Sequence, residues 1–243
     1  MRPQEKLNAK RRSVSSVVGR WYVEFPLIVA GYLVFGLVRA ALDPGAPAAT
    51  NTAEFVQRLE HALNIDVEYS LNHALLGHPV AIYVTGYFYR LCVLAVPAVL
   101  VWLYVWWRDR YGRLRTVLVV MTLADLLFVW LVPESPPRLA QAGIVDHMAD
   151  HDILGAAASR THGQTLNISG AMPSMHVAWT TWCAFAVFSV LRRRWPRAAW
   201  LAWLFPALVA FVVLVTGHHY VLDVVAGVAL VAAVVWLTRR LVQ

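Results

Sequence analysis

The sequence predicts an all-α membrane protein: a polytopic helical bundle with six transmembrane helices and both termini in the cytoplasm. Of its 243 residues, 59% are hydrophobic and only 14% are charged. A soluble domain is typically about 45–50% apolar and about 25% charged, and a disordered chain is more polar still. Two cysteines are too few for a disulfide-stabilised secreted domain. The remaining observation is a series of six long apolar runs.

Each of these runs approaches the length of about 20 residues that a helix needs to cross a bilayer. No internal repeat or separate soluble domain is evident between them, so we expect residues 1–243 to form a single membrane domain that begins with a basic tail at 1–20. The expected spans lie at residues 25–41, 83–107, 116–132, 175–191, 198–215 and 220–237.

The positive charges predict the orientation. Sixteen of the 21 Lys and Arg residues lie in the N-terminal tail, in the connections after the second and fourth runs, or at the C-terminus. A six-span model places all of these segments on one side, which the positive-inside rule identifies as cytoplasmic. Five or seven spans would divide them between the two faces. We therefore attribute the net charge of +7 to orientation, and expect no nucleic-acid partner.

Two long external segments, residues 42–80 and 133–172, are expected on the opposite face. Within the first, residues 53–75 place apolar side chains such as Phe55 at helical spacing, with charged side chains such as Glu60 between them. This pattern predicts an amphipathic helix lying on the outer leaflet.

Three polar motifs interrupt the apolar pattern, and the six-span model places all three on the outer face. One follows the third span, one begins the fourth and one begins the sixth. The number of spans does not require this coincidence, so we interpret it as one assembled site. The motifs are Pro-Pro-Arg at 136–138, Pro-Ser-Met-His at 173–176 and His-His-Tyr-Val-Leu-Asp at 218–223.

His219 and Asp223 are four residues apart and share a face on a helix. The carboxylate can accept the proton of one imidazole nitrogen, which leaves the other nitrogen free as a nucleophile or base. A carboxylate within a span is costly without a partner, which favours a functional role. The alternative is a pair that only caps a turn at the interface.

The other two motifs are suited to binding an anion. Ser174 is a good N-cap for the fourth span, and His176 lies in the first turn, where free backbone amides attract anions. Arg138 offers a planar guanidinium, the preferred partner of phosphate or carboxylate. Singly, these residues have plainer interpretations as a helix cap, an interfacial histidine and a headgroup anchor. As a set they favour phosphoryl transfer, which depends on positioning and charge stabilisation.

The second and third motifs resemble signature motifs of the type 2 phosphatidic acid phosphatase (PAP2) superfamily, and look closest to its branch related to inositol phosphorylceramide synthases. The resemblance covers residues 136–227, with the spans in matching order. It implies that His219 is the nucleophile that forms a phosphohistidine. It implies that Asp223 orients this nucleophile and that His176 protonates the leaving group. It implies phosphate-binding roles for Arg138 and Ser174 and, more weakly, for Asn167 and Gly170.

The sequence departs from the family pattern in two places. The Lys that the family carries seven residues before Arg138 is replaced by Leu131, and the Ser-Arg pair of the third motif falls on Val212 and Val213. We expect His218 to supply part of the missing positive charge at the phosphate. The departures fit the synthase-like branch better than the diphosphate phosphatases.

Four further polar residues have open interpretations. Arg90 and Asp125 fall within apolar runs, and we expect them to pair because lone charges in a membrane are costly. The alternative is that Arg90 lies at the outer end of a shorter span and reaches toward the phosphate. His147 and His151 are four residues apart and surrounded by aspartates. This spacing is compatible with a metal site but more typical of a polar, substrate-facing loop.

The sequence thus predicts an integral cell-membrane lipid phosphatase or phosphotransferase whose site faces the extracytoplasmic side. The expected substrate is a lipid phosphate, such as phosphatidic acid, a polyprenyl (di)phosphate or an inositol-phosphate lipid. Water would accept the phosphoryl group in a phosphatase and an alcohol in a headgroup transferase, and the same residues serve both. A non-catalytic lipid-binding scaffold or transporter is the alternative. The proposed chemistry needs no metal or cofactor, and the oligomeric state is open.

Overall fold

The computed structural model describes residues 20–42, 46–156 and 170–241, and in this part of the chain the regular structure is helical apart from one isolated bridge between Glu134 and Gly170. Five helical segments are long and apolar enough to cross a membrane. They are α2 (Trp21–Ala41), α5 with α6 (Pro79–Trp106), α7 (Arg108–Leu131), α12 with α13 (Pro196–Val215) and α14 (Val221–Leu241).

The remaining apolar segment, the fourth of the six along the chain, is α11 (Met175–Leu191). It begins and ends where the sequence predicts but has only 17 residues. It packs against α6, α7, α13 and α14, and most of its side chains are buried. Trp182 at its centre donates a hydrogen bond to the Leu114 carbonyl at 2.9 Å. A helix enclosed by other helices need not match the bilayer thickness, because irregular backbone beyond its end is tolerated where protein surrounds it.

Two of the long segments are interrupted by a turn of 3-10 helix, and the remaining helices are short or lie outside the apolar runs. The interrupted segments are α5 (Pro79–Leu91), η1 (Cys92–Leu94) and α6 (Ala95–Trp106), and α12 (Pro196–Ala199), η2 (Trp200–Trp203) and α13 (Leu204–Val215). The others are α3 (Ala46–Leu63), α4 (Glu68–His73), α8 (Pro137–Ala140) and α9 (His147–Asp150).

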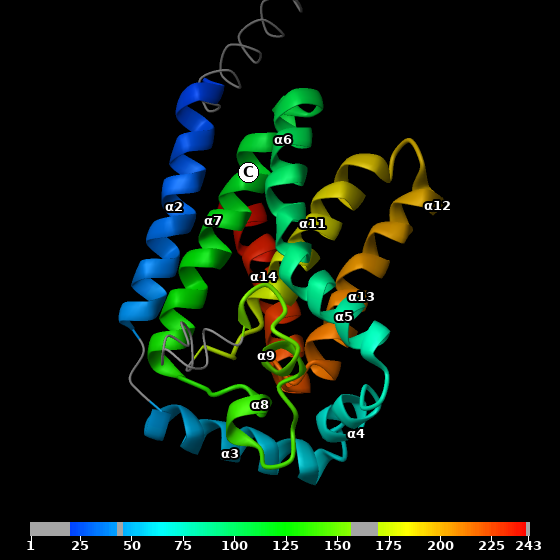
Figure 1. The fold of residues 1–243 in the computed structure, drawn as a ribbon. Coiled ribbons are helices and arrows are strands. Elements are labelled where there is room, and N and C mark those ends of the chain that lie inside the picture. The colour runs from blue at the N-terminus through cyan, green and yellow to red at the C-terminus, as the bar shows by residue number, and fades with distance from the viewer. Residues whose placement is uncertain (1–19, 43–45, 157–169, 242–243) are drawn as a thin grey trace, which may run out of the picture.

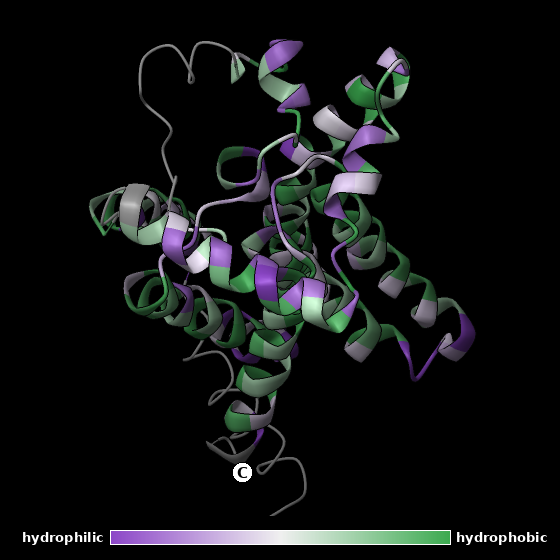
Figure 2. Cartoon of the chain, turned by 90° about the horizontal axis from the view of Figure 1, so that it is seen from below, coloured by the Kyte–Doolittle hydropathy of each residue, from purple (hydrophilic) through white to green (hydrophobic). Residues whose placement is uncertain are grey.

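The two ends of the bundle differ in character. Helices α3, α4 and α8 lie at one end, and the α6–α7 and α11–α12 connections lie at the other (Figure 1). Seen from the α3 end, polar residues concentrate on the nearest helices and loops, while the long helices behind them are mainly hydrophobic (Figure 2). The basic connections are therefore separated from the long polar segments, as the six-span model expects. The cytoplasmic location of the basic end stays a prediction.

The outer segment is not the single helix predicted over residues 53–75. It forms α3 and α4, separated at Asn64, which has a φ of 55°. Helix α3 docks on the bundle through small residues such as Ala53, packed against Tyr220, while Phe55 is exposed. Glu60 is fully buried, and its carboxyl group accepts from the backbone N–H of Leu222 in the bundle. The charged side of α3 at Glu60 therefore faces the protein, contrary to the prediction.

The predicted pair of Arg90 and Asp125 is wrong. Asp125 of α7 binds Arg39 of α2, with 2.9 Å between Oδ2 and Nη1, and both side chains are buried. Arg90 is exposed on α5. The reason is that α2 packs against α7 along the bundle, a neighbour relation that the order of the spans does not reveal. The alternative role of Arg90 near the phosphate stays a prediction.

Helices α11 and α14 cross very closely at Gly227. A Cβ atom at this position would lie 2.7 Å from the carbonyl oxygen of Ser174. Small residues at such crossings let two backbones approach in membrane proteins. The close approach also brings the beginnings of the two helices together.

We expect Gly227→Ala to push these helices apart and to lower the free energy of unfolding by about 1–3 kcal/mol, the usual cost of overpacking. Thermal unfolding in detergent measures the effect. Gly36→Ala on α2 is the matched control, because a Cβ there meets nothing within 4 Å and alanine is the better helix former. Equal unfolding temperatures for the two variants would contradict the assignment of a tight crossing.

Candidate functional site

The three polar motifs meet where α11 and α14 begin. The rings of His176 and His219 have centroids 6.2 Å apart, although most of α11 and all of α12 and α13 lie between the two residues in the sequence. His219 is buried and His176 is half-buried. At this separation both rings can contact one phosphoryl group. The expectation that the motifs assemble on one side of the bundle is therefore met.

Asp223 holds the ring of His219. Its Oδ2 lies 3.2 Å from Nδ1 of His219 and accepts a second hydrogen bond from the backbone N–H of Tyr220 at 2.9 Å. The carboxylate also lies in the first turn of α14, where the helix dipole favours negative charge. With the Nδ1 proton directed at Asp223, Nε2 of His219 carries the free lone pair.

Ser174 links the second and third motifs. Its hydroxyl accepts from the backbone N–H of Val177 at 3.5 Å, and its own N–H donates to the carbonyl of Asp223 at 3.0 Å. The side chain is fully buried and acts here as the N-cap of α11. Its role in binding a phosphate oxygen stays a prediction.

Arg138 joins the site through His218. Its Nε donates to Nε2 of His218 at 3.1 Å, and its backbone N–H donates to the carbonyl of Gly217 at 2.9 Å. Asp146 lies 3.8 Å from the guanidinium. Within the described part of the chain, Nη1 of Arg138 is buried without a hydrogen-bond partner, so one donor of the guanidinium is available to an anion.

His218 does not fit the expected role of an additional positive charge. Its Nε2 accepts from Arg138, so its proton lies on Nδ1, which is 3.1 Å from both the carbonyl and the hydroxyl oxygens of Thr216. Burial and the neighbouring guanidinium lower the pKa of His218 well below its ordinary value. A neutral ring at this position orients Arg138.

Tyr89 of α5 is part of the site, although the sequence analysis did not identify it. Its ring stacks on that of His176 with centroids 4.2 Å apart, and lies 4.4 Å from that of His218. It therefore sets the positions of two of the three histidines. An aromatic residue within an apolar span is ordinarily a core residue, so its sequence context offered no signal.

Three buried glutamates surround the first turn of α14, and the sequence analysis missed all of them as site residues. Glu60 accepts from the N–H of Leu222 at 2.6 Å, and Glu68 accepts from that of Val221 at 3.0 Å. Burial raises the pKa of Glu60 to about 9 and that of Glu134 to about 11, and it also raises the pKa of Glu68. The only available signal was that Glu134 directly precedes Ser-Pro-Pro-Arg.

The structure does not show either of the two weaker candidates for phosphate binding, Asn167 and Gly170, beside the histidines. Asn167 lies outside the described residues. Gly170 lies against Arg39: its carbonyl accepts from this guanidinium, and a Cβ atom would be only 2.6 Å from Nη2. Only glycine fits this contact without displacing Arg39. A role of Gly170 at the phosphate stays a prediction.

The two histidines considered for a metal bind backbone carbonyls. His147 Nε2 lies 3.0 Å from the carbonyl of Asn72, and His151 Nδ1 lies 3.1 Å from that of His147. In the part of the chain that the structure describes, no group of three or more His, Cys, Asp or Glu side chains is arranged to hold a metal ion.

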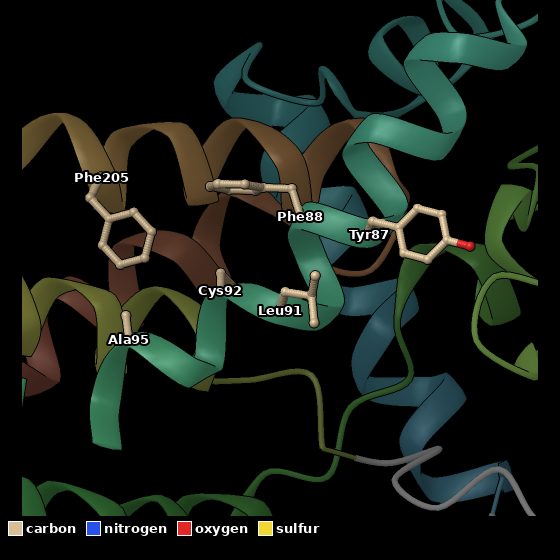
Figure 3. A pocket seen from close by; sticks show the side chains of 6 residues that line it. All are labelled: Tyr87, Phe88, Leu91, Cys92, Ala95 and Phe205. Carbon is tan, nitrogen blue, oxygen red and sulfur yellow. The ribbon is translucent and has the colours of Figure 1, made fainter. Parts of the chain in front are cut away.

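An apolar pocket lies between α5–α6 and α13, beside the site. Its volume is about 330 Å³. Phe205 of α13 faces Cys92 and Ala95 across the pocket (Figure 3). Its wall residues Phe88 and Cys92 pack in the same cluster as Tyr89, the residue stacked on His176. The pocket is lined by Tyr87, Phe88, Leu91, Cys92, Ala95 and Phe205.

Comparison with known proteins agrees with the motifs. A family model described as the PAP2 superfamily matches residues 54–237, a range that includes all three motifs. Curated proteins and solved structures yield no match. The family match spans most of the 243 residues and indicates a membrane protein of the phosphatase or phosphotransferase type. The chain therefore belongs to the PAP2 superfamily.

Proposed function

We propose that the protein is an integral membrane lipid-phosphate phosphatase or phosphotransferase that acts through a phosphohistidine at His219. The observation that carries the proposal is the placement of two imidazoles within 6.2 Å of each other, with one of them held by a buried carboxylate. One ring then has a free nitrogen for attack, and the other lies close enough to move a proton to or from the same phosphoryl group.

The proposed reaction has two steps. In the first, Nε2 of His219 attacks phosphorus, the bond from phosphorus to the lipid oxygen breaks, and His176 gives a proton to that oxygen. In the second, water or an alcohol attacks the phosphohistidine, His176 takes the proton of the attacking hydroxyl, and the bond between nitrogen and phosphorus breaks. Asp223 stabilises the positive charge that develops on His219.

The phosphoryl oxygens would be bound by two kinds of donor. The free Nη1 of Arg138 is one of them. The backbone N–H groups in the first turn of α11 are the other, since a helix N-terminus favours anions. Donors that are already fixed before the reaction stabilise the charge of the transition state most effectively.

The apolar pocket supports a lipid as the substrate. An alkyl chain in it would contact Phe88 and Phe205, whose rings lie 6.3 Å apart, and Tyr89 would separate the chain from the phosphate at His176. Pockets of this kind are largely apolar, with a few polar groups that set orientation. The resemblance to the inositol phosphorylceramide synthase branch supports transfer to an alcohol as well as hydrolysis.

We also propose that α11 crosses the membrane as the fourth of six spans and that the site faces the extracytoplasmic side of the cell membrane. The support is the gathering of α3, α4 and α8 at the end opposite the basic connections (Figure 1), together with the positive-inside rule. In this orientation a lipid headgroup of the outer leaflet reaches the histidines from the side.

A panel of lipid phosphates presented to the purified protein in detergent tests the function. We expect turnover of at least one of these lipids, with release of inorganic phosphate from phosphatidic acid or a polyprenyl (di)phosphate, or of inositol phosphate from an inositol-phosphate lipid. A short-chain soluble phosphate ester should turn over at least about tenfold more slowly, because it lacks roughly 1.4 kcal/mol or more of apolar contact.

The same assay repeated with an alcohol acceptor separates the two reaction types. A transferase forms a new phosphate ester of the acceptor alcohol at the expense of the hydrolysis product, whereas a phosphatase that uses only water is unaffected by the acceptor. Failure of every lipid phosphate to turn over, with the protein folded, would overturn the proposed function.

A further inference from the structure

Glu134 is a fully buried carboxyl group that belongs to none of the three motifs. It lies between α7 and α8, and backbone hydrogen bonds fix the chain around it. Its carbonyl accepts from the N–H of Ala171 at 3.0 Å, and the next N–H, that of Ser135, donates to the carbonyl of Ala49 at 3.1 Å. The backbone at Glu134 is thus held from two directions, and its side chain is enclosed by protein.

The carboxyl group of Glu134 meets that of Asp223 within hydrogen-bonding range. In the described part of the chain, both carboxyl oxygens of Glu134 and Oδ1 of Asp223 are buried and have no donor group of another residue. Two ionised carboxylates in this arrangement would repel each other and leave three buried acceptors without a proton. One proton between the two groups removes the repulsion and joins two of the three oxygens in a hydrogen bond.

The surroundings decide which group carries this proton. Asp223 accepts from the N–H of Tyr220 and faces Nδ1 of His219, and it lies in the first turn of α14. These contacts stabilise its ionised form. Glu134 has no such donors within the described residues. Burial and the charge of Asp223 raise its pKa to about 11, so it is protonated at neutral pH.

We propose that Glu134 is a positioning residue whose neutral carboxyl group donates a hydrogen bond to Oδ1 of Asp223 and thereby fixes Oδ2 opposite Nδ1 of His219. The inference rests on the proposed function, because it assigns Glu134 to the support of the same nucleophile. Glu134 makes no bond to the substrate and its proton is not consumed. It extends the His219–Asp223 pair by one member, in the way that outer residues orient catalytic groups.

Other titratable groups face this pair. Glu60 of α3 and Tyr220 before α14 lie within electrostatic range of Glu134 or Asp223, and Glu68 of α4 lies within range of Glu60 and Tyr220. Glu60 and Glu68 are hydrogen-bonded to each other, and their pKa values are raised by burial. The pKa of Tyr220 is raised as well. Glu54 on the same helix as Glu60 is the control, because its side chain is 55% exposed.

Kinetics of Glu134→Gln and Glu134→Leu test the proposal. Glutamine keeps a donor for Asp223, so we expect kcat within about threefold of the wild type. Leucine removes the donor, so kcat should fall about 10–100-fold, the usual effect of losing an outer orienting residue, with little change in KM. Equal losses for both variants would overturn the proposal. Thermal unfolding in detergent identifies any variant that is not folded.

The pH dependence of kcat/KM gives a readout that a merely structural role would not move. Without the donor, the negative charge on Asp223 is less stabilised, so protonation at the acidic limb should occur about one to two pH units higher in Glu134→Leu. If Glu134 were ionised, its removal would shift this limb to lower pH. An unmoved limb or a downward shift would overturn the proposal, and Glu54→Gln should leave the limb in place.

Infrared difference spectroscopy tests the shared proton without any substrate. At neutral pH, the wild type minus Glu134→Gln should show the carbonyl band of a protonated carboxylic acid. A carboxylate band instead would overturn the inference even if the enzyme is active. Absence of turnover in the wild type would overturn the proposed function alone, since the infrared result does not depend on catalysis.

Discussion

Replacing His219 by alanine should lower kcat by at least about a thousandfold, because the nucleophile on which the proposed phosphohistidine forms is lost. With a lipid phosphate labelled at phosphorus, the wild type should also acquire acid-labile, protein-bound label, and the variant should acquire none. The measurement is phosphate release together with the amount of labelled protein after a rapid quench. The fold should be retained, since the site lies in the junction between α13 and α14 and the ring is replaced by a smaller group.

His61→Ala is the matched control for this experiment, because the His61 side chain lies on α3 and is 79% exposed. His176→Ala separates the two roles: it keeps the nucleophile but removes the proton donor. It should therefore still accept label from a phosphate ester with a good leaving group, which needs no protonation. Turnover retained by the His219 variant would contradict the mechanism.

Replacing Arg39 by methionine should lower the free energy of unfolding by about 3–5 kcal/mol, because it leaves Asp125 as a buried charge without its partner. The two side chains are 8% and 0% exposed. Arg39 also donates to the carbonyl of Gly170, so this contact is lost at the same time. For a chain of this size the midpoint of thermal unfolding in detergent should fall by about 10 °C.

Arg90→Met is the matched control, because Arg90 is exposed and makes no ion pair with Asp125. The double variant Arg39→Met with Asp125→Leu should recover most of the loss, since replacing both members of a buried pair removes the uncompensated charge. A large loss on changing Arg90, together with a small loss on changing Arg39, would contradict the packing of α2 against α7.

The long apolar helices could be predicted because a lipid environment restricts the backbone to regular structure and requires long apolar runs. The predicted ends of the apolar runs and the observed ends of the helices differ by a few residues. Helix α7 begins at Arg108, well before the predicted residue 116, because long basic side chains can extend from a helix end to the interface. Helix α11 begins as predicted, since Ser174 caps it locally.

The local part of the site was also predictable. His219 and Asp223 are neighbours on one helical turn, so their spacing predicts the contact between Nδ1 and Oδ2. The six-span model also predicted that this pair lies on the same side as His176, and the rings of His176 and His219 do lie close together. The partner of Arg138 did not follow: the role of His218 as a neutral acceptor depends on burial that only the packed structure reveals.

The amino-acid sequence by itself determined the apolar segments, the side of the bundle on which the motifs lie and the pairing of His219 with Asp223. These features depend on hydrophobicity and on contacts within one helical turn. Only the tertiary structure decided that Arg39 neutralises Asp125, that Tyr89 packs against two histidines and that Glu134 meets Asp223. The physical reason is that these partners are up to about 130 residues apart in the sequence. These contacts form because particular helices pack side by side. The spacing of residues along the chain does not reveal which helices do so.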